Sequence, residues 1–152
     1  LFAVLSIFLV LLSTQMYRGT VSNADKTGAY RIRTSYIRSM TRSMDAADSV
    51  RIDTWTDDSG ETISIVSFME NYDGDAYVTQ IYAWDGSMWE RFTEAIYEFD
   101  PEDGDRICDM DEMDVKLEDN LLTAKIMHQG EEQEVCVALR CPQTEMEDRD
   151  AE

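Results

Sequence analysis

The chain has 152 residues, of which 43% are hydrophobic and 10% aromatic, and its formal net charge is −19. This length suits one domain with a hydrophobic core, and the apolar content excludes a wholly disordered chain. Residues 1–56 hold seven basic and four acidic side chains (net +3), whereas residues 57–152 hold six basic and 28 acidic ones (net −22). So acidic a region repels phosphate, which excludes nucleic acid as a partner.

The first 17 residues, LFAVLSIFLVLLSTQMY, contain no charged side chain. Apolar residues would cover every face of a helix here, which favours burial in lipid or in an assembly over packing on one side of a small domain. A cleaved signal peptide and an ordinary membrane span are alternatives, but the run lacks a basic start and an Ala-x-Ala-like site, and spans need about 20 apolar residues. We expect packing against lipid or neighbouring helices through Leu5, Phe8, Leu9 and Leu12.

Residues 18–50 predict an amphipathic helix that continues the first. The segment has no proline, and its two glycines each weaken a helix by only about 1 kcal/mol. Apolar side chains recur at helical spacing, and we expect the helix to pack on a sheet through Tyr30, Ile37, Met40 and Met44. Four arginines, at 31, 33, 38 and 42, occupy other faces, where they are either solvated or paired with acidic neighbours.

Beyond Asp48 the sequence changes to short runs rich in Val, Ile, Thr, Tyr, Phe and Trp, separated by clusters of Asp, Gly and Asn. β-branched and aromatic residues favour strands, and the polar clusters favour tight turns. The predicted strands are SVRIDTW, ETISIVSFM, AYVTQIYAW, SMWERFTE, DVKLE, LLTAKIM and EVCVAL.

Two-residue turns separate three pairs of these strands, at Asp85-Gly86, Asp119-Asn120 and Gln129-Gly130. Such dipeptides favour the positive φ angles of tight antiparallel hairpins. We therefore expect an α+β fold, in which an antiparallel meander packs on the amphipathic half of one long N-terminal helix. The head would extend over residues 51–141, followed by an acidic tail at 142–152 that we expect to be disordered.

Acidic turns raise the question of a calcium site. No stretch matches the spacing of an EF-hand loop, because Gly104 in DPEDGDRICDMD comes one position too early. A different calcium site remains an alternative, although tight turns use the same residue types for their own geometry. Its ligands would be Asp100, Glu102, Asp103 and Asp105.

The three cysteines and the single histidine, His128, lack the spacing of a zinc site. Cys136 and Cys141 are five apart and would lie on opposite faces of a strand, so we predict a disulfide between Cys108 and Cys141. The chain has no glycine-rich phosphate loop and no serine elbow, and His128 has no evident nucleophile beside it. We expect a non-enzymatic protein without a cofactor.

Aromatic side chains gather around the Asp85-Gly86 turn. A carbohydrate or a protein partner could bind such rings, although ordinary cross-strand pairs in a hairpin use them as well. The residues concerned are Tyr82, Trp84, Trp89 and Phe92.

An apolar helix, an amphipathic continuation and an antiparallel sheet with a C-terminal cysteine together resemble the type IV pilin and pseudopilin superfamily. The segments LFAVLSIFLVLL, MYRGTV, RTSYIRSMTRSMDAADSV, YAWDGSMWERF, DPEDG and ALRC are similar to an uncharacterised prepilin-like family of Firmicutes. That family is a domain of unknown function encoded near pilus or type II secretion genes. The resemblance extends up to Cys141.

The resemblance implies a pilin-like structural subunit, inserted in the membrane through the apolar helix and later packed helix to helix in a filament at the cell surface. The +3 first part and the −22 remainder could attract each other across subunits, an effect that salt weakens. A single-pass, membrane-anchored extracytoplasmic module, which binds a ligand with its aromatic hairpin or its acidic turns, is the alternative.

Overall fold

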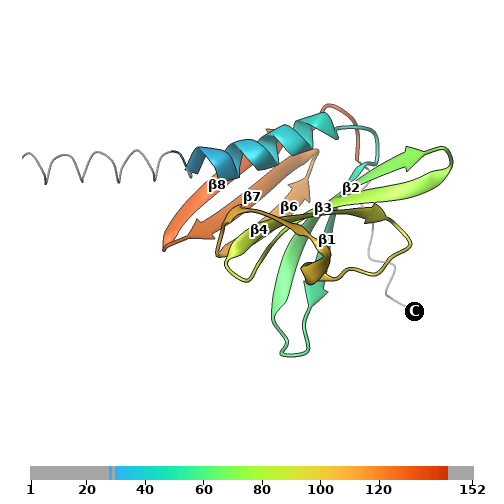
Figure 1. Ribbon diagram of the computed structural model, residues 1–152. Helices are drawn as coiled ribbons and strands as arrows, with labels where there is room; N and C mark the ends of the chain where they lie inside the picture. Colours follow the sequence, from blue (N-terminus) through green and yellow to red (C-terminus); the bar gives the residue numbers. More distant parts are fainter. Residues whose placement is uncertain (1–27, 29, 144–152) are drawn as a thin grey trace, which may run out of the picture. The chain divides into compact units, whose positions relative to one another are not determined.

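The computed structural model of the chain describes residues 28 and 30–143. The chain divides into two compact units, Leu1–Ile32 and Arg33–Glu152, and the fold below is that of the second. A helix covers residues 30–43, and strands account for most of the remainder (Figure 1). The strands are β1 (Val50–Thr56), β2 (Thr62–Tyr72), β3 (Asp75–Trp84), β4 (Ser87–Glu94), β5 (Asp105–Asp109), β6 (Glu112–Glu118), β7 (Leu121–His128) and β8 (Glu131–Ala138), with a short 3-10 helix, η1 (Pro101–Asp103), before β5.

The strands form two antiparallel sheets, one with the order β1-β2-β3-β4-β5 and one with the order β6-β7-β8. Each strand therefore pairs only with its neighbours in sequence. Both residues of all three predicted turns have positive φ, as at Asp85 (47°) and Gly86 (69°), so those hairpins are confirmed. A fourth turn of the same kind, Asp73-Gly74, joins β2 to β3.

The expected α+β fold with one long, pilin-like helix is wrong. The described residues are mostly strand, and their helix covers only residues 30–43 rather than continuing to residue 50. After the helix ends, the Ser49 hydroxyl lies 2.7 Å from the carbonyl oxygen of Met44 and 2.8 Å from that of Ala46, and these hydrogen bonds hold the turn that leads to β1. No helix within residues 28 and 30–143 is long and apolar enough to cross a membrane.

Two groups of predicted residues lie outside the described residues. One is the apolar run 1–17, with its packing positions Leu5, Phe8, Leu9 and Leu12, together with the start of the predicted amphipathic helix at residues 18–27. Most of the acidic tail, residues 144–152, is the other. The predictions made for both segments therefore stay predictions.

The main hydrophobic core lies between the two sheets and the helix. Val66, Phe68 and Ile81 contribute from the five-stranded sheet, and Leu122 and Val135 from the three-stranded sheet. Figure 1 shows the helix lying over the three-stranded sheet. In that sheet buried and exposed residues alternate, as expected when one face meets a core and the other meets water.

The five-stranded sheet is buried on both faces in its centre, which explains the nearly continuous buried runs of β2 and β3. The face away from the main core is covered by the segment between β4 and β5. There the hydroxyl of Tyr82 donates to the carbonyl oxygen of Pro101 (2.9 Å), and its ring meets Phe99 edge to face. Arg91, 4% exposed, donates to Gln80 (3.1 Å) on the same face.

Three of the four residues predicted to pack the helix on a sheet reach the core. Ile37 is fully buried, and Met40 and Met44 pack against the core from its edge, whereas Tyr30 is 44% exposed. The expectation that the arginines all lie away from the sheets is wrong for Arg33, which is 4% exposed.

Candidate functional site

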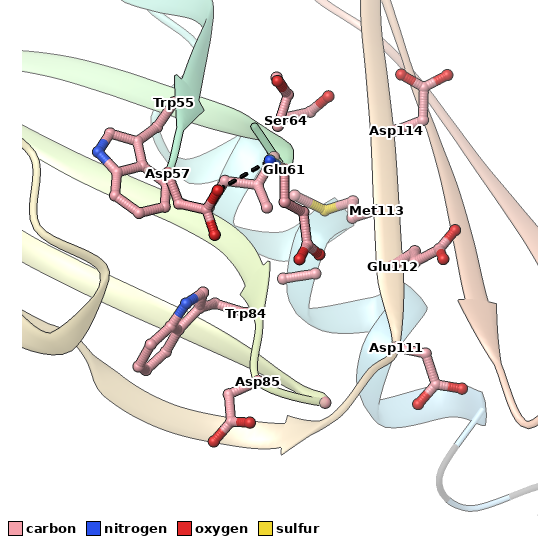
Figure 2. A pocket seen from close by; sticks show the side chains of 14 residues that line it. Trp55, Asp57, Glu61, Ser64, Trp84, Asp85, Asp111, Glu112, Met113 and Asp114 are labelled. Carbon is pink, nitrogen blue, oxygen red and sulfur yellow. Dashed lines mark hydrogen bonds between the residues drawn. The ribbon is translucent and has the colours of Figure 1, made fainter. Parts of the chain in front are cut away.

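A cleft of about 660 Å³ opens between the two sheets, where β1, β2 and the β3–β4 turn face the start of β6 (Figure 2). We call it the acidic cleft. Strands supply nine of its lining residues, and the short turns next to them supply the other five. The lining residues are Trp55, Asp57, Glu61, Thr62, Ile63, Ser64, Ala83, Trp84, Asp85, Gly86, Asp111, Glu112, Met113 and Asp114.

Six of these lining residues are acidic and none is basic. Figure 2 shows Trp55 and Trp84 on one wall and the carboxylates of Asp111, Glu112 and Asp114 along the other. Carboxylates that face each other across a hollow surface focus a negative potential into it. The lining therefore attracts positively charged groups and repels anions.

Asp57 is the most firmly held of these carboxylates. Its Oδ1 accepts hydrogen bonds from the hydroxyl of Ser59 (2.7 Å), the amide of Ser59 (2.8 Å) and the amide of Glu61 (2.8 Å). The Ser59 hydroxyl and then the Glu61 amide hold the pKa of Asp57 below its ordinary value of 3.8. Asp57 is therefore ionised, with a fixed orientation, at neutral pH.

Both indoles have aromatic neighbours that set their orientation. Trp84 meets Trp89 edge to face, with ring centroids 5.7 Å apart, and the Trp89 Nε1–H donates to the carbonyl oxygen of Trp84 (2.8 Å). Trp55 meets Phe99 in the same way, at 5.9 Å. Because Trp55 and Trp84 alternate with core residues, both indoles lie on the face of the five-stranded sheet that carries Tyr82 and Phe99. The feature that the cleft offers to a cation is therefore its group of carboxylates.

The four predicted calcium ligands do not come together as a cation site. The Asp100 carboxylate accepts from the amide of Glu102 (2.9 Å) and thereby caps η1, and the Asp103 carboxylate lies 3.6 Å from the Arg91 guanidinium. Asp105 pairs with Glu90 in the sheet register. In the part of the chain that the structure describes, no three His, Cys, Asp or Glu side chains are grouped so that they could hold a metal ion.

The predicted disulfide is not formed, because all three cysteines are free thiols. Cys108 lies in β5 beside Met88, where burial raises the pKa of its thiol. Cys141 follows β8, and its S–H donates to the carbonyl oxygen of Asp45 (3.4 Å). Each half-buried thiol thus has its own surroundings, one at an edge of the five-stranded sheet and one beside the end of the helix.

The aromatic residues predicted to gather at the β3–β4 turn are divided between the two faces of the sheet. Trp84 and Trp89 contact each other, but Tyr82 is fully buried under Phe99. Phe92 lies on the opposite face and is 58% exposed. They do not form one binding surface.

A polar cluster that joins the helix to both sheets was not predicted. Arg33 donates from Nη1 to the carbonyl oxygen of Asp109 (3.1 Å), at the end of β5, and from Nε to the side chain of Gln133 (3.5 Å), in β8. The Tyr36 hydroxyl donates to Glu90, and burial, followed by that hydrogen bond, raises the pKa of Tyr36. The helical spacing of Arg33, Tyr36 and Ile37 was the available signal, since all three lie on one face.

A family model described as "Domain of unknown function (DUF4860)" matches residues 29–129, which is more than half of the chain. The chain therefore belongs to this family. The match runs from the helix to the end of β7 and includes every residue that lines the acidic cleft. No curated protein and no solved structure matches the chain.

Proposed function

We propose that the chain is a non-enzymatic structural subunit of a type IV pilus-like filament or pseudopilus, held in the membrane by its apolar segment until it assembles. The resemblance of its sequence segments to prepilin-like proteins supports this proposal. The observation that carries it is an uncharged apolar run, residues 1–17, followed in the same chain by a helix that is built into a folded head.

The attachment of the helix to the head suits a subunit that is pulled and packed through its N-terminal segment. Ile37 and Thr41 are fully buried one turn apart, and the Arg33 guanidinium bonds to residues of both sheets. A load on the helix therefore reaches the core directly rather than through a flexible linker. Apolar residues on every side of segment 1–17 would be covered by lipid first and by neighbouring subunits afterwards.

The proposal is tested by the intact mass and the N-terminal residue of the native protein, taken from membranes and from material sheared off the cell surface. A processed chain in the sheared fraction, together with other subunits, is the expected result. A chain found only in membranes, and never in sheared material under conditions that produce filaments, would contradict it.

A charged substitution in the apolar segment gives a second test. An arginine at the centre of a membrane helix costs about 3 kcal/mol, so we expect Leu9→Arg to deplete the protein from both the membrane and the sheared fraction. Ser39→Arg, on the exposed side of the helix in the head, is the matched control and should leave both fractions unchanged. Normal recovery of Leu9→Arg in both fractions would exclude a role for this segment.

The acidic cleft favours a second candidate function, an anchored module that binds a cationic ligand. Its chemistry suits an organic cation such as a quaternary ammonium or an alkylguanidinium, because six carboxylates line it and no basic side chain does. Tryptophan fluorescence of the full chain, titrated with tetramethylammonium and with methylguanidinium, should report such binding. Asp57→Asn should weaken it about tenfold, whereas Glu134→Gln, an exposed change outside the cleft, should not.

A further inference from the structure

The outer side of the helix carries two arginines without partners. Arg38 and Arg42 are exposed, one turn apart, and neither guanidinium pairs with a carboxylate of the described residues. Like charges at this spacing repel and weaken an isolated helix. Cations left unpaired in a chain of net charge −19 therefore form a surface that favours an acidic partner.

An exposed group of aromatic rings lies at the end of the five-stranded sheet, where β2, β3 and β4 extend past the core. We call Tyr72, Tyr77 and Phe92 the aromatic patch. Tyr77 stacks on Phe92, with centroids 5.5 Å apart and an interplanar angle of 11°, and meets Tyr72 edge to face at 5.8 Å. Tyr72 is 53% exposed and Phe92 is 58% exposed. Ile96 and Tyr97, in the turn after β4, are exposed as well.

The surroundings of the aromatic patch are acidic. In the sheet register, Glu70 and Glu94 lie opposite Tyr77, and Asp75 lies opposite Tyr72. Glu70 also accepts a hydrogen bond from the Tyr72 hydroxyl (3.0 Å). Flat rings bordered by carboxylates suit a guanidinium, which stacks on a ring with its face and donates to carboxylates with its edge.

We propose that Arg38 and Arg42 of one copy dock on the aromatic patch of a second copy of this chain. The charge complementarity of the two surfaces argues for this occupant, because among the described residues of one copy neither surface has the oppositely charged partner that the other supplies. The inference rests on the proposed function, since assembly brings copies together. The two surfaces are unlike, so the contact can repeat from copy to copy along a filament.

The contact is tested by cross-linking the full chain, carrying Arg42→Lys, in phospholipid vesicles. Isotopically light and heavy copies are mixed and treated with a carbodiimide, which joins an amine to a carboxylate in direct contact. We expect mixed-isotope links between position 42 and Glu70 or Glu94. Links from position 42 that reach only the cleft residues Asp57 and Glu61, or none between copies, would overturn the proposal.

Charge reversal provides an independent test that does not depend on the cross-linker. Energy transfer between copies labelled at the exposed Cys136 measures their association in the same vesicles. Arg38→Glu with Arg42→Glu should weaken association at least tenfold, and adding Glu70→Lys and Glu94→Lys should restore most of it. Lys116→Glu with Lys125→Glu, exposed on the other sheet, changes the charge equally and should have no effect.

These readouts separate the two proposals. Two results would overturn the docking of these two surfaces. One is a loss of association that the added Glu→Lys substitutions do not rescue, and the other is an equal loss in the control variant, Lys116→Glu with Lys125→Glu. Absence of the chain from sheared filaments would contradict the proposed function instead. Each variant is checked for native circular dichroism and for recovery in membranes, so that unfolding is not mistaken for lost association.

Discussion

At Gly104, between η1 and β5, the chain has no room for a side chain. A Cβ would collide with the hydroxyl oxygen of Tyr82 and lie 3.1 Å from the carbonyl oxygen of Glu90. The Tyr82 hydroxyl cannot easily move away, because it is buried and donates to Pro101. The glycine therefore lets the segment between β4 and β5 lie close to the sheet.

We expect Gly104→Ala to lower the free energy of unfolding by about 1–3 kcal/mol, the usual cost of forcing extra volume into a packed site. Urea denaturation followed by tryptophan fluorescence measures the change. Gly28→Ala is the control, since its Cβ would meet nothing within 4 Å. An unchanged midpoint for Gly104→Ala would show that Tyr82 can move aside at little cost.

Asp45 makes the stability of the fold depend on pH, at the place where the end of the helix meets the segment after β8. Its carboxylate accepts from the amides of Arg140 (2.8 Å) and Cys141 (3.1 Å). Burial alone would raise the pKa of Asp45, but these amides and the Arg140 guanidinium outweigh it and hold the pKa below its ordinary value of 3.8. A carboxyl whose pKa is lower in the folded state stabilises that state above its unfolded pKa and loses this effect as pH falls.

We expect the native chain and Asp45→Asn to differ in their free energy of unfolding. This difference should stay constant above about pH 5 and shrink as the pH falls below 3.8, the ordinary pKa of an aspartate. Urea titrations at several pH values measure it. A difference that does not change with pH would mean that the two amides hold the neutral carboxyl equally well.

Among the secondary-structure elements, the helix is held in place by the burial of one side chain more than by the helix propensity of its residues. Ile37 is fully buried in the core formed by both sheets. We expect Ile37→Ala to lower the free energy of unfolding by about 2–5 kcal/mol through lost burial and the cavity left behind. Ser39→Ala, two residues away on the exposed side, should change it by less than about 0.5 kcal/mol. Thermal unfolding followed by circular dichroism compares the two.

The sequence predicts the strands better than their arrangement. Seven of the eight strands were predicted from β-branched and aromatic runs, and the turns between them from their dipeptides. β5 was missed, because DRICD is short, charged and next to turn residues. The division into two sheets depends on tertiary contacts that leave no periodic signal. The turn after the helix is held by local hydrogen bonds of Ser49, which leave no periodic signal either.

The acidic cleft could not be predicted for a related reason. Its lining comes from β1, β2, β3, β6 and the turns beside them, and β6 meets the other strands only when the two sheets pack together. Each carboxylate taken alone has the ordinary role of a turn or surface residue, as Asp57 has in its own turn. The shared negative field appears only once the sheets place them around one hollow.

For the whole molecule, one hydrophobic core serves both sheets, with Ile81, Met88 and Ile126 among its fully buried side chains. We expect the sheets to unfold as one unit, because neither can separate without exposing that core. Ile126→Ala, in β7, should therefore increase amide hydrogen exchange in β3 as much as in β7. Faster exchange confined to β6, β7 and β8 would show that the three-stranded sheet opens by itself.

The strand order also has a consequence for the moment of synthesis. Every strand pairs with its neighbour in sequence, so each hairpin can close as soon as it emerges from the ribosome or translocon. The carboxylate of Asp45 is an exception, because its partner Arg140 follows 95 residues later. This contact at the end of the helix therefore forms only after all eight strands have been synthesised, and a chain truncated before Arg140 would lack it.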